Sequence, residues 1–372
     1  MEDYPLLKIG IIGSGGIAGF IHIPGFQLCP NVEVAVACDS SAETAEATAR
    51  AFNIPATTTD YREVIANPDI DAVVIATPNN LHQPISLEAL AAGKHVLCEK
   101  PIGMNAAEAE EMALVARQSG LVHVVSFVYR FVPALRYLKH LVDGGHLGEI
   151  RHFRATYLCA VPDIWIGWRN HKELAGSGVL GDLGSHLIDF ARHLVGEVDA
   201  VSGWVKTLLP QRLVAGTDRY KECTTDDTAA FLAEFRNGVT GVFEVSWHAP
   251  GRGGRDTDFQ YIELNGSKGT AVYHLQEPFQ LRLCPGEPYS KDQLFTVPVP
   301  RAFHKWPGSS RDVRADAPNV GFRYDQAFAF IQAIRGLESA HLPDFEDGLA
   351  AQLVVDAVLE AASARRWVTV KR

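Results

Sequence analysis

An aspartate and a histidine lie one helical turn apart in the stretch GSGVLGDLGSH, which covers residues 176–186 and leads into an apolar helical pattern. Asp182 and His186 share one stripe of this pattern with Asp189 and His193, and the apolar residues form another face. Such a stripe is typical of the solvated side of a surface helix or, with a third ligand, of a metal site. The sequence supplies no third ligand, because it has no HExxH motif and no cysteine pair.

The glycines of the same stretch favour a binding site over a plain surface helix. Glycine in the first turns of a helix is less favourable than alanine by about 0.5 to 1 kcal/mol, so repeated glycine marks the close approach of another backbone or a ligand. Gly178, Gly181 and Gly184 would clear space beside Asp182 and His186.

A second glycine-rich turn, GSGGIAG at residues 13–19, follows the apolar run KIGII and precedes a helical pattern at residues 20–29. In a dinucleotide-binding turn, Gly13 would permit the tight turn and Gly15 would let the backbone approach a pyrophosphate. The small Ala18 would let the helix pack closely on the strand. Glycine turns of this kind also occur for packing alone.

An acidic residue follows this turn at the expected distance. Asp39 ends the apolar run VEVAVACD about 20 residues further on, where a carboxylate accepts hydrogen bonds from the ribose hydroxyls. Its negative charge would repel a 2′-phosphate, which favours NAD over NADP. The alternative is that Asp39 caps the helix that starts at Ser41.

Further candidate cofactor contacts are Gly16, Ile17, Ser40, Thr77, Pro78, Asn79 and His82. His82 is equally a helix-start residue.

Alternating strand and helix patterns fill the first third of the chain. The apolar runs lie at residues 8–12, 32–39, 71–78, 94–101 and 121–127, with helical patterns between them. This alternation predicts right-handed crossovers and a parallel sheet that is covered on both faces. We therefore predict a doubly wound α/β domain, of the Rossmann type, over residues 1–126.

Residues 127–372 are predicted to form a second α/β domain with an open, largely antiparallel sheet. Strand patterns lie at residues 150–158, 229–235, 239–247, 259–264, 270–275 and 366–370, and Asn237-Gly238 and LNGSKG provide hairpin turns. Helical patterns lie at residues 132–142, 180–194, 324–336 and 346–364. Residues 285–320 are expected to form a long irregular segment on the surface.

Composition and charge narrow the class of protein. A length of 372 residues with 47% hydrophobic content fits a soluble protein of two domains. The net charge of -10, without a basic run, argues against nucleic-acid and membrane partners. Six scattered cysteines fit reduced thiols in a cytoplasm, and no metal is expected. The N-terminal apolar run is too short for a signal peptide or a membrane span.

Together these motifs resemble the glucose-fructose oxidoreductase, inositol dehydrogenase and rhizopine-catabolism (Gfo/Idh/MocA) family of NAD(P)-dependent sugar oxidoreductases. GSGGIA, ATPNNLH at 76–82, CEKP at 98–101, WR at 168–169 and GDLGSH at 181–186 occur in the family's order over nearly the whole chain. The resemblance implies a Rossmann domain and a mixed α/β domain whose sheet often forms the oligomer interface. It also implies a carbohydrate substrate and a homo-oligomer, either a dimer or a tetramer.

By this resemblance Lys100, Asp182 and His186 match the family's catalytic residues. Oxidation of a secondary alcohol needs hydride transfer to the nicotinamide and removal of the hydroxyl proton. His186 suits the base, because the ordinary pKa of histidine is about 6.5. Lys100 would polarise the reacting oxygen, although a lysine there alone is typical of a solvated strand end, and Asp182 would orient the substrate or the histidine. The resemblance also implies a cis peptide before Pro101.

Aromatic and basic residues near the start of the second domain are candidates for the sugar site, because aromatic faces and bidentate donors suit a polyhydroxylated ring. They are Tyr129, Arg130, Trp165, Trp168 and Arg169, and each is also a plausible packing residue. Glu99, Lys100, Trp168 and Arg169 are further candidate cofactor contacts.

Three functions are therefore considered. The first is an NAD-dependent dehydrogenase acting on a secondary hydroxyl of a sugar, sugar derivative or cyclitol. The second is a glycosidase or lyase in which bound NAD oxidises the sugar transiently. The third is a cofactor-binding regulator without catalysis, against which the presence of all three catalytic residues argues.

Overall fold

The computed structural model describes residues 4–161, 164–252, 259–285, 293–316, 320–337 and 342–371. The chain forms two compact units, each assembled from separate segments. The first unit contains Met1–Val128, Trp306–Arg311 and Val320–Leu349, and the second contains Tyr129–Lys305, Asp312–Asn319 and Ala350–Arg372. The sequence predicted one division, after residue 126, and did not foresee that later segments return to the first unit.

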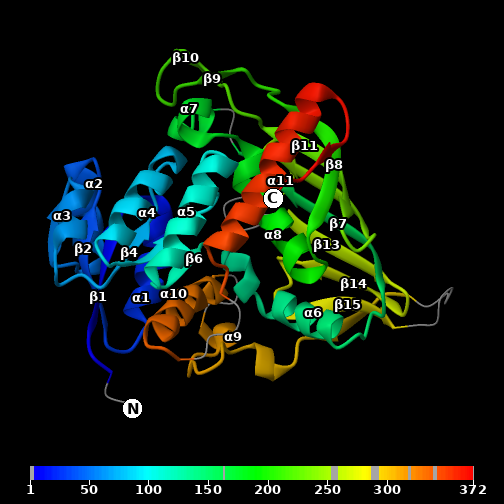
Figure 1. Ribbon diagram of the computed structural model, residues 1–372, viewed down its shortest axis with the longest axis horizontal. Helices are drawn as coiled ribbons and strands as arrows, with labels where there is room; N and C mark the ends of the chain where they lie inside the picture. The colour runs from blue at the N-terminus through cyan, green and yellow to red at the C-terminus, as the bar shows by residue number, and fades with distance from the viewer. Residues whose placement is uncertain are drawn as a thin grey trace. The chain divides into compact units, whose positions relative to one another are not determined.

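A parallel sheet of six strands forms the middle of the first unit, in the order β3-β2-β1-β4-β5-β6 (Figure 1). The strands are β1 (Leu7–Ile12), β2 (Val32–Cys38), β3 (Ala56–Thr58), β4 (Ala72–Ile75), β5 (His95–Cys98) and β6 (His123–Val125). The helices are η1 (Ala18–His22), α1 (Ile23–Gln27), α2 (Ala42–Phe52), α3 (Tyr61–Ala66), η2 (Asn79–Leu81), α4 (His82–Ala91), α5 (Ala106–Ser119) and α10 (Gly321–Ile334). The predicted doubly wound fold is confirmed, and the short β3, α3 and η2 were missed among the described residues of this unit.

The strand order of this sheet reverses between β1 and β4. In open α/β sheets, ligands bind outside the carboxyl ends of the strands at such a reversal. The loops that follow β1, β2, β4 and β5 are therefore the place to look for a cofactor site.

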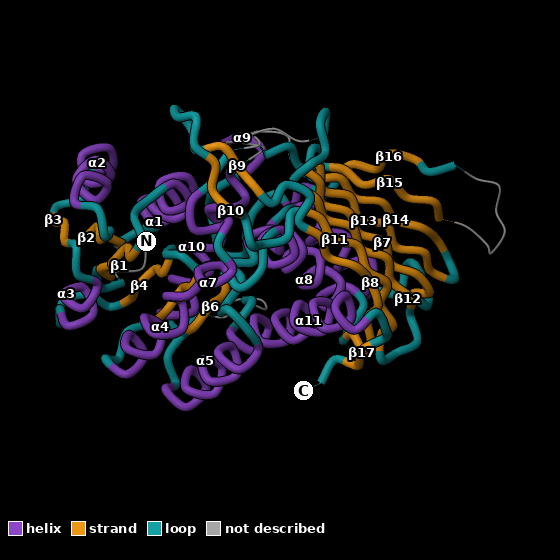
Figure 2. Tube along the Cα trace, turned by 90° about the horizontal axis from the view of Figure 1, so that it is seen from above, coloured by secondary structure: helices purple, strands orange, loops and turns teal. Residues whose placement is uncertain are grey.

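The second unit contains a sheet of nine strands, in the order β16-β15-β14-β13-β7-β12-β11-β8-β17 (Figure 2). Only the β7–β12 pair is parallel among these described strands, so the predicted largely antiparallel sheet is confirmed. The strands are β7 (Ile150–Leu158), β8 (Val198–Lys206), β11 (Thr228–Phe235), β12 (Thr240–Ser246), β13 (Phe259–Gly266), β14 (Gly269–His274), β15 (Gln280–Pro285), β16 (Phe295–Pro298) and β17 (Val368–Thr369). A separate hairpin joins β9 (Gln211–Leu213) to β10 (Tyr220–Glu222).

Helical segments of this unit lie against one face of the nine-stranded sheet. Contacts join α8 to β7, α6 to β14 and β15, and η5 to β12. The unit's helical segments, including those without such a contact, are α6 (Pro133–Asp143), η4 (Gly167–Asn170), α7 (Lys172–Ala175), η5 (Leu180–Gly184), α8 (Ser185–Leu194), η6 (Arg301–Phe303) and α9 (Val313–Asp316). Two further helices, η3 (Val128–Phe131) and α11 (Phe345–Ala364), run from one unit into the other.

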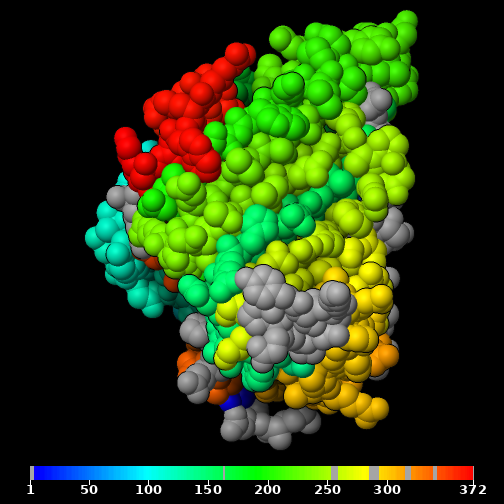
Figure 3. All heavy atoms as spheres, turned by 90° about the vertical axis from the view of Figure 1, so that its right-hand side faces the viewer, coloured from blue at the N-terminus to red at the C-terminus, as the bar shows by residue number. Residues whose placement is uncertain are grey.

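The opposite face of the nine-stranded sheet is exposed. Figure 3 looks onto this side, where green to yellow strand atoms form much of the surface. Burial alternates along the strands, as in β7, where Phe153 and Ala155 are buried and Arg154 between them is exposed. This alternation is typical of a sheet that covers a core on one side only.

Five strands of the second unit were not predicted, namely the nine-residue β8 and the shorter β9, β10, β15 and β16. The segment expected to be irregular, residues 285–320, contains β16, η6 and α9 among its described residues. Its residues 286–292 and 317–319 lie outside the described part of the chain. The predicted hairpin turn between β11 and β12 is confirmed, because Gly238 has a φ of +85° there.

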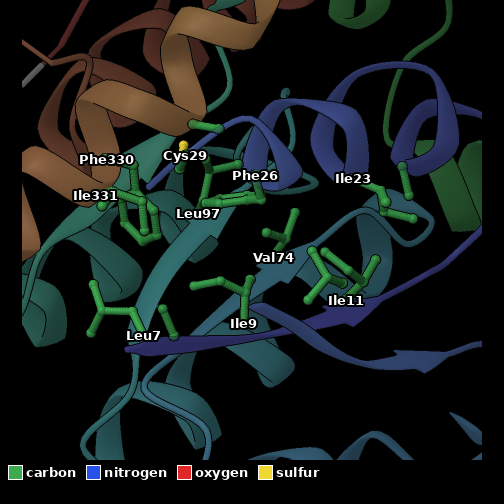
Figure 4. Packing of buried hydrophobic residues seen from close by; sticks show 14 of the residues in the cluster. Leu7, Ile9, Ile11, Ile23, Phe26, Cys29, Val74, Leu97, Phe330 and Ile331 are labelled. Atoms are coloured by element: carbon green, nitrogen blue, oxygen red, sulfur yellow. The ribbon is translucent and has the colours of Figure 1, made fainter. Parts of the chain in front are cut away.

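The core of the first unit combines residues from both ends of the chain. Figure 4 shows Phe330 and Ile331 of α10 beside Phe26, Cys29 and Leu97. The rings of Phe26 and Phe330 meet edge to face, with centroids 6.2 Å apart. The helix α10 therefore completes this core, although it follows β6 by almost 200 residues.

The described residues contain no helix that is both long and apolar enough to cross a membrane. All six cysteines are free, and four of them are buried.

Candidate cofactor and catalytic sites

The glycine turn after β1 lies at the carboxyl end of the parallel sheet. Gly13 has a φ of +86°, and a Cβ on it would lie 2.6 Å from the carbonyl carbon of Ala76. A Cβ on Gly15 or Gly16 would meet no atom of the described chain within 4 Å. The turn thus needs glycine at residue 13 and leaves open space beside the next two glycines, which fits a pyrophosphate approaching the backbone N–H groups.

The turn is tied to its neighbours by main-chain hydrogen bonds. The N–H groups of Gly13 and Ser14 donate to the Cys38 carbonyl at the end of β2, over 2.9 and 3.1 Å. Ala18 is fully buried, as its proposed close packing requires, and Ile17 precedes the π-helical turn η1. The roles of Gly16 and Ile17 as cofactor contacts stay predictions.

Asp39 follows β2 at the same edge of the sheet. One oxygen of its carboxylate accepts the N–H of Ser41 over 3.0 Å, in a short turn ahead of α2. The helix is capped instead by Ser41, whose hydroxyl accepts the N–H of Thr44. The alternative role of Asp39 as the helix cap is therefore wrong. Contact of Asp39 and Ser40 with a ribose stays a prediction.

The loop after β4 carries Thr77, Pro78 and the buried Asn79, and ends at His82. His82 is the first residue of α4 and is fully buried. Its ring nitrogens lie 2.9 Å from the Pro101 carbonyl oxygen and 3.1 Å from the Thr77 carbonyl oxygen. Burial lowers the pKa of His82, against the two carbonyls, which raise it. His82 thus joins the loop after β4 to the loop after β5. Its own contact with a cofactor stays a prediction.

Glu99 and Lys100 follow β5. The Glu99 carboxylate lies 2.7 Å from the ring of His22 and accepts the backbone N–H of Lys100 over 3.2 Å. Lys100 is half-buried, and its peptide bond to Pro101 is cis, as the resemblance implied. The Glu99 side chain is therefore bound within the protein, and its predicted cofactor contact remains a prediction.

The pKa of Glu99 gives a pH-dependent stability. Burial would raise this pKa, but His22, Lys100 and Ser126 together lower it to about 2. A carboxyl with a lower pKa in the folded chain stabilises the fold above the unfolded pKa, and this contribution is lost as the pH falls from about 4.5 toward about 2.

We therefore expect the wild type to exceed Glu99→Gln in free energy of unfolding at pH 6, by on the order of 3 kcal/mol. The difference should shrink as the pH approaches 2, and urea unfolding at a series of pH values measures it. A difference in free energy of unfolding that stays constant over this pH range would contradict the lowered pKa of Glu99.

In the second unit, Asp182 lies in η5 and His186 in the first turn of α8. The His186 side chain is only 5% exposed, and its ring meets that of Tyr129 nearly at right angles, with centroids 4.7 Å apart. Asp189 of the same stripe is 0% exposed. The alternative interpretation of this stripe as the solvated side of a surface helix is therefore wrong.

The glycines ahead of α8 do mark a close approach. A Cβ on Gly178 would lie 1.8 Å from the carbonyl oxygen of Asp226. The Asp226 carboxylate accepts the N–H groups of Gly178 and Leu180, over 2.6 and 2.8 Å. Burial raises the pKa of Asp226, which those hydrogen bonds counteract. The neighbour is thus another backbone segment of the same unit, and it fixes the start of the helical segment that carries Asp182 and His186.

Tyr129 and Arg130 both lie against α8. The Tyr129 hydroxyl is 2.7 Å from that of Tyr157, and its ring contacts His186. The Arg130 guanidinium binds the Asp189 carboxylate with both Nε and Nη2. These two residues therefore support the helix that carries His186, and their contact with a substrate stays a prediction.

The other aromatic candidates gather in the segment around η4. The Trp165 ring meets His171 edge-on at 4.7 Å, and the Lys221 ammonium lies 5.3 Å from its centroid. The Arg169 guanidinium lies 4.3 Å above the Trp168 ring. All three candidates are half-buried, and their binding roles stay predictions.

Two residues of these sites were missed in the sequence. His22 lies in the helical pattern after the glycine turn, and Asp226 lies between two strand patterns. Neither belongs to a motif, so only their contacts with Glu99 and Gly178 reveal them. Among the described residues, no group of three His, Cys, Asp or Glu side chains could hold a metal ion.

The arrangement of each unit defines a class of protein. The first unit has the strand order, the open glycine turn and the acidic residue of a dinucleotide-binding domain, and the second carries a buried histidine that could exchange protons. These features are typical of a nicotinamide-dependent oxidoreductase.

Comparison with known proteins gives the family. Residues 7–127 match the oxidoreductase family with an NAD-binding Rossmann fold, and residues 135–272 match the GFO/IDH/MocA C-terminal domain. The chain therefore belongs to the Gfo/Idh/MocA family of oxidoreductases. The expected NAD cofactor and the expected class of activity, an NAD-dependent sugar oxidoreductase, are confirmed.

Individual relatives match the chain over nearly its whole length or over part of it. The chain is 33% identical to levoglucosan dehydrogenase of Pseudarthrobacter phenanthrenivorans, over 98% of each chain. It is 35% identical to D-glucoside 3-dehydrogenase of Escherichia coli, over 51% of this chain and 54% of the other. The solved structure of levoglucosan dehydrogenase in complex with NADH and L-sorbose matches with a TM-score of 0.90 at 31% identity, covering 99% of this chain and 100% of that one.

Proposed function

We propose that this protein oxidises a secondary hydroxyl of a sugar or anhydrosugar such as levoglucosan. NAD, when bound, supplies the acceptor for the hydride. The full-length similarity to levoglucosan dehydrogenase supports the choice of substrate class. The open space beside Gly15 and Gly16 supports the fit of the dinucleotide.

His186 is proposed to remove the proton of the reacting hydroxyl. The observation that carries this role is the buried position of its ring against Tyr129, because an imidazole shielded from bulk water can exchange a proton with a bound alcohol. Lys100 is proposed to stabilise the negative charge that develops on the same oxygen. Asp182, one turn before His186, is proposed to orient the substrate hydroxyls.

The experiment is a substrate panel with purified protein. Monosaccharides, inositols, anhydrosugars and glycosides are each incubated with NAD or NADP, and reduced cofactor and sugar products are followed. Net NADH formation with a free sugar or anhydrosugar supports the proposal. Cleavage of a glycoside without net NADH would contradict it and would indicate transient oxidation. Lys100→Met, assayed on the best substrate, tests the lysine separately.

Asp39 provides a prediction about cofactor choice. Asp39→Ser removes the charge that repels a 2′-phosphate, while its hydroxyl retains a hydrogen-bond acceptor for the N–H of Ser41. We expect kcat/KM with NAD to fall about tenfold, which corresponds to about 1.4 kcal/mol, and kcat/KM with NADP to rise. Steady-state kinetics with both cofactors measure this. Asp60→Ser, which removes a carboxylate from the cap of α3, is the control and should leave the preference unchanged.

We also propose that the protein is a homo-oligomer that associates through the exposed face of its nine-stranded sheet. This face carries Trp204 and Leu232, which are 45% and 49% exposed, on the adjacent strands β8 and β11. Exposed apolar side chains of this kind mark association sites. We expect the Trp204→Glu/Leu232→Glu double variant to sediment as a monomer, and an unchanged mass would contradict the proposal.

The six free cysteines support a cytoplasmic location.

A further inference from the structure

A buried hydrogen bond joins the helical turn after the glycine loop to the segment that carries Lys100. The His22 Nε2 atom lies 2.7 Å from Oε1 of Glu99, and the His22 side chain is 2% exposed. An ionised carboxylate can only accept, so His22 is the donor. Both residues belong to the first unit, and this contact is not part of the cofactor or catalytic roles assigned above.

The Glu99 carboxylate is held from two further directions. Its Oε2 atom accepts the backbone N–H of Lys100, over 3.2 Å, and the Ser126 side chain also forms a hydrogen bond to the carboxylate. Ser126 in turn accepts a hydrogen bond from Gln326 of α10, over 3.1 Å. The carboxylate therefore connects η1, the end of β5, the end of β6 and α10 within one unit.

We propose that His22 is a positioning residue for Lys100, acting through Glu99. The imidazole fixes the Glu99 carboxylate, and the carboxylate fixes the backbone from which the lysine side chain extends. This inference rests on the proposed function of Lys100. Without the His22 donor, a buried carboxylate loses its closest partner and turns or takes up a proton, so the hydrogen bond to the Lys100 backbone is weakened.

The test begins with two substitutions of His22. His22→Leu removes the donor and keeps an apolar side chain, whereas His22→Gln keeps an N–H donor on an uncharged side chain. We expect His22→Leu to lower kcat about 10- to 100-fold, because small misplacements of a reacting group have effects of this size. The dissociation constant for NADH and the KM for the sugar should change little. His22→Gln should recover most of the lost kcat.

A cycle with Glu99 separates positioning from general damage. If His22 acts through Glu99, the His22→Leu/Glu99→Gln double variant has the same kcat as Glu99→Gln alone. Ile23→Ala is the matched control, because Ile23 is the next residue, is fully buried and touches the hydrophobic core. It should lower thermal stability and leave kcat nearly unchanged at a temperature where the protein is folded.

The kinetic results distinguish failure of the positioning role of His22 from failure of the proposed role of Lys100. Multiplicative losses in the double variant, a kcat of His22→Leu within twofold of wild type, or equal losses in His22→Gln and His22→Leu each overturn the positioning role. A wild-type kcat in Lys100→Met overturns the proposed function of the lysine itself, and it does so independently of any substitution at His22.

Discussion

Replacement of His186 by alanine should lower kcat for sugar oxidation at pH 7 by about 100- to 10,000-fold, which is the usual contribution of a general base. The His186 ring is buried against Tyr129 in the first turn of α8. Bulk water therefore does not readily take over its role as the base. Binding of NADH should be retained, because the glycine turn belongs to the other unit. Steady-state kinetics with the best sugar of the substrate panel, together with NADH fluorescence titration, measure the two effects.

His193 supplies the matched control for this prediction. It lies two turns further along the same helix and is half-buried. His193→Ala should leave kcat within about twofold of wild type, because it lies far along the helix from the proposed base. A comparable loss in both variants, or wild-type turnover in His186→Ala, would show that His186 is not the base.

The second large effect is expected on stability. Asp189→Ala leaves the Arg130 guanidinium buried without its bidentate carboxylate, in a position where the two charges are 7% and 0% exposed. Removal of one partner of a buried pair lowers the free energy of unfolding by about 3 to 5 kcal/mol. Urea unfolding should show this loss as a lower midpoint. The Arg130→Met/Asp189→Leu double variant should recover most of it, because no buried charge remains.

An exposed ion pair of the same unit is the control. Arg366 and Glu360 lie 2.8 Å apart with both side chains more than half exposed. Glu360→Ala should lower the free energy of unfolding by less than about 1 kcal/mol. If Asp189→Ala were no worse than Glu360→Ala, the buried pair would not support α8 in the way described.

Local patterns predicted the elements that bury a long apolar run, such as β1, β4 and α8. They missed the exposed three-residue strand β3, the six-residue helix α3, the edge strand β16 and its neighbour β15. Short or edge strands carry weak periodicity, because few of their side chains enter the core. The return of α10 to the first unit depends on contacts with α1 across almost 300 residues, which no local pattern contains.

The candidate sites show the same limit of local patterns. Gly13 could be predicted, because a tight turn before a helix has a local sequence signature. Arg130 was a candidate for the sugar site or for packing, and its guanidinium binds Asp189. The glycines before α8 were expected to admit another backbone or a ligand, and at Gly178 the neighbour is the backbone of Asp226. A sequence shows that a charge or a glycine needs a neighbour, and only the tertiary structure shows which one.

The contribution of α10 to the first core has a consequence for synthesis of the protein. Phe330 and Ile331 leave the ribosome long after the strands of the parallel sheet whose core they share. Until then, apolar side chains such as Phe26 and Leu7 stay without part of their partners, so the amino-terminal segment emerges as an incomplete nucleus for chaperones to shield. The core of the first unit is therefore complete only after α10 has been synthesised, and a nascent chain stalled before this helix holds an unfinished nucleotide-binding unit.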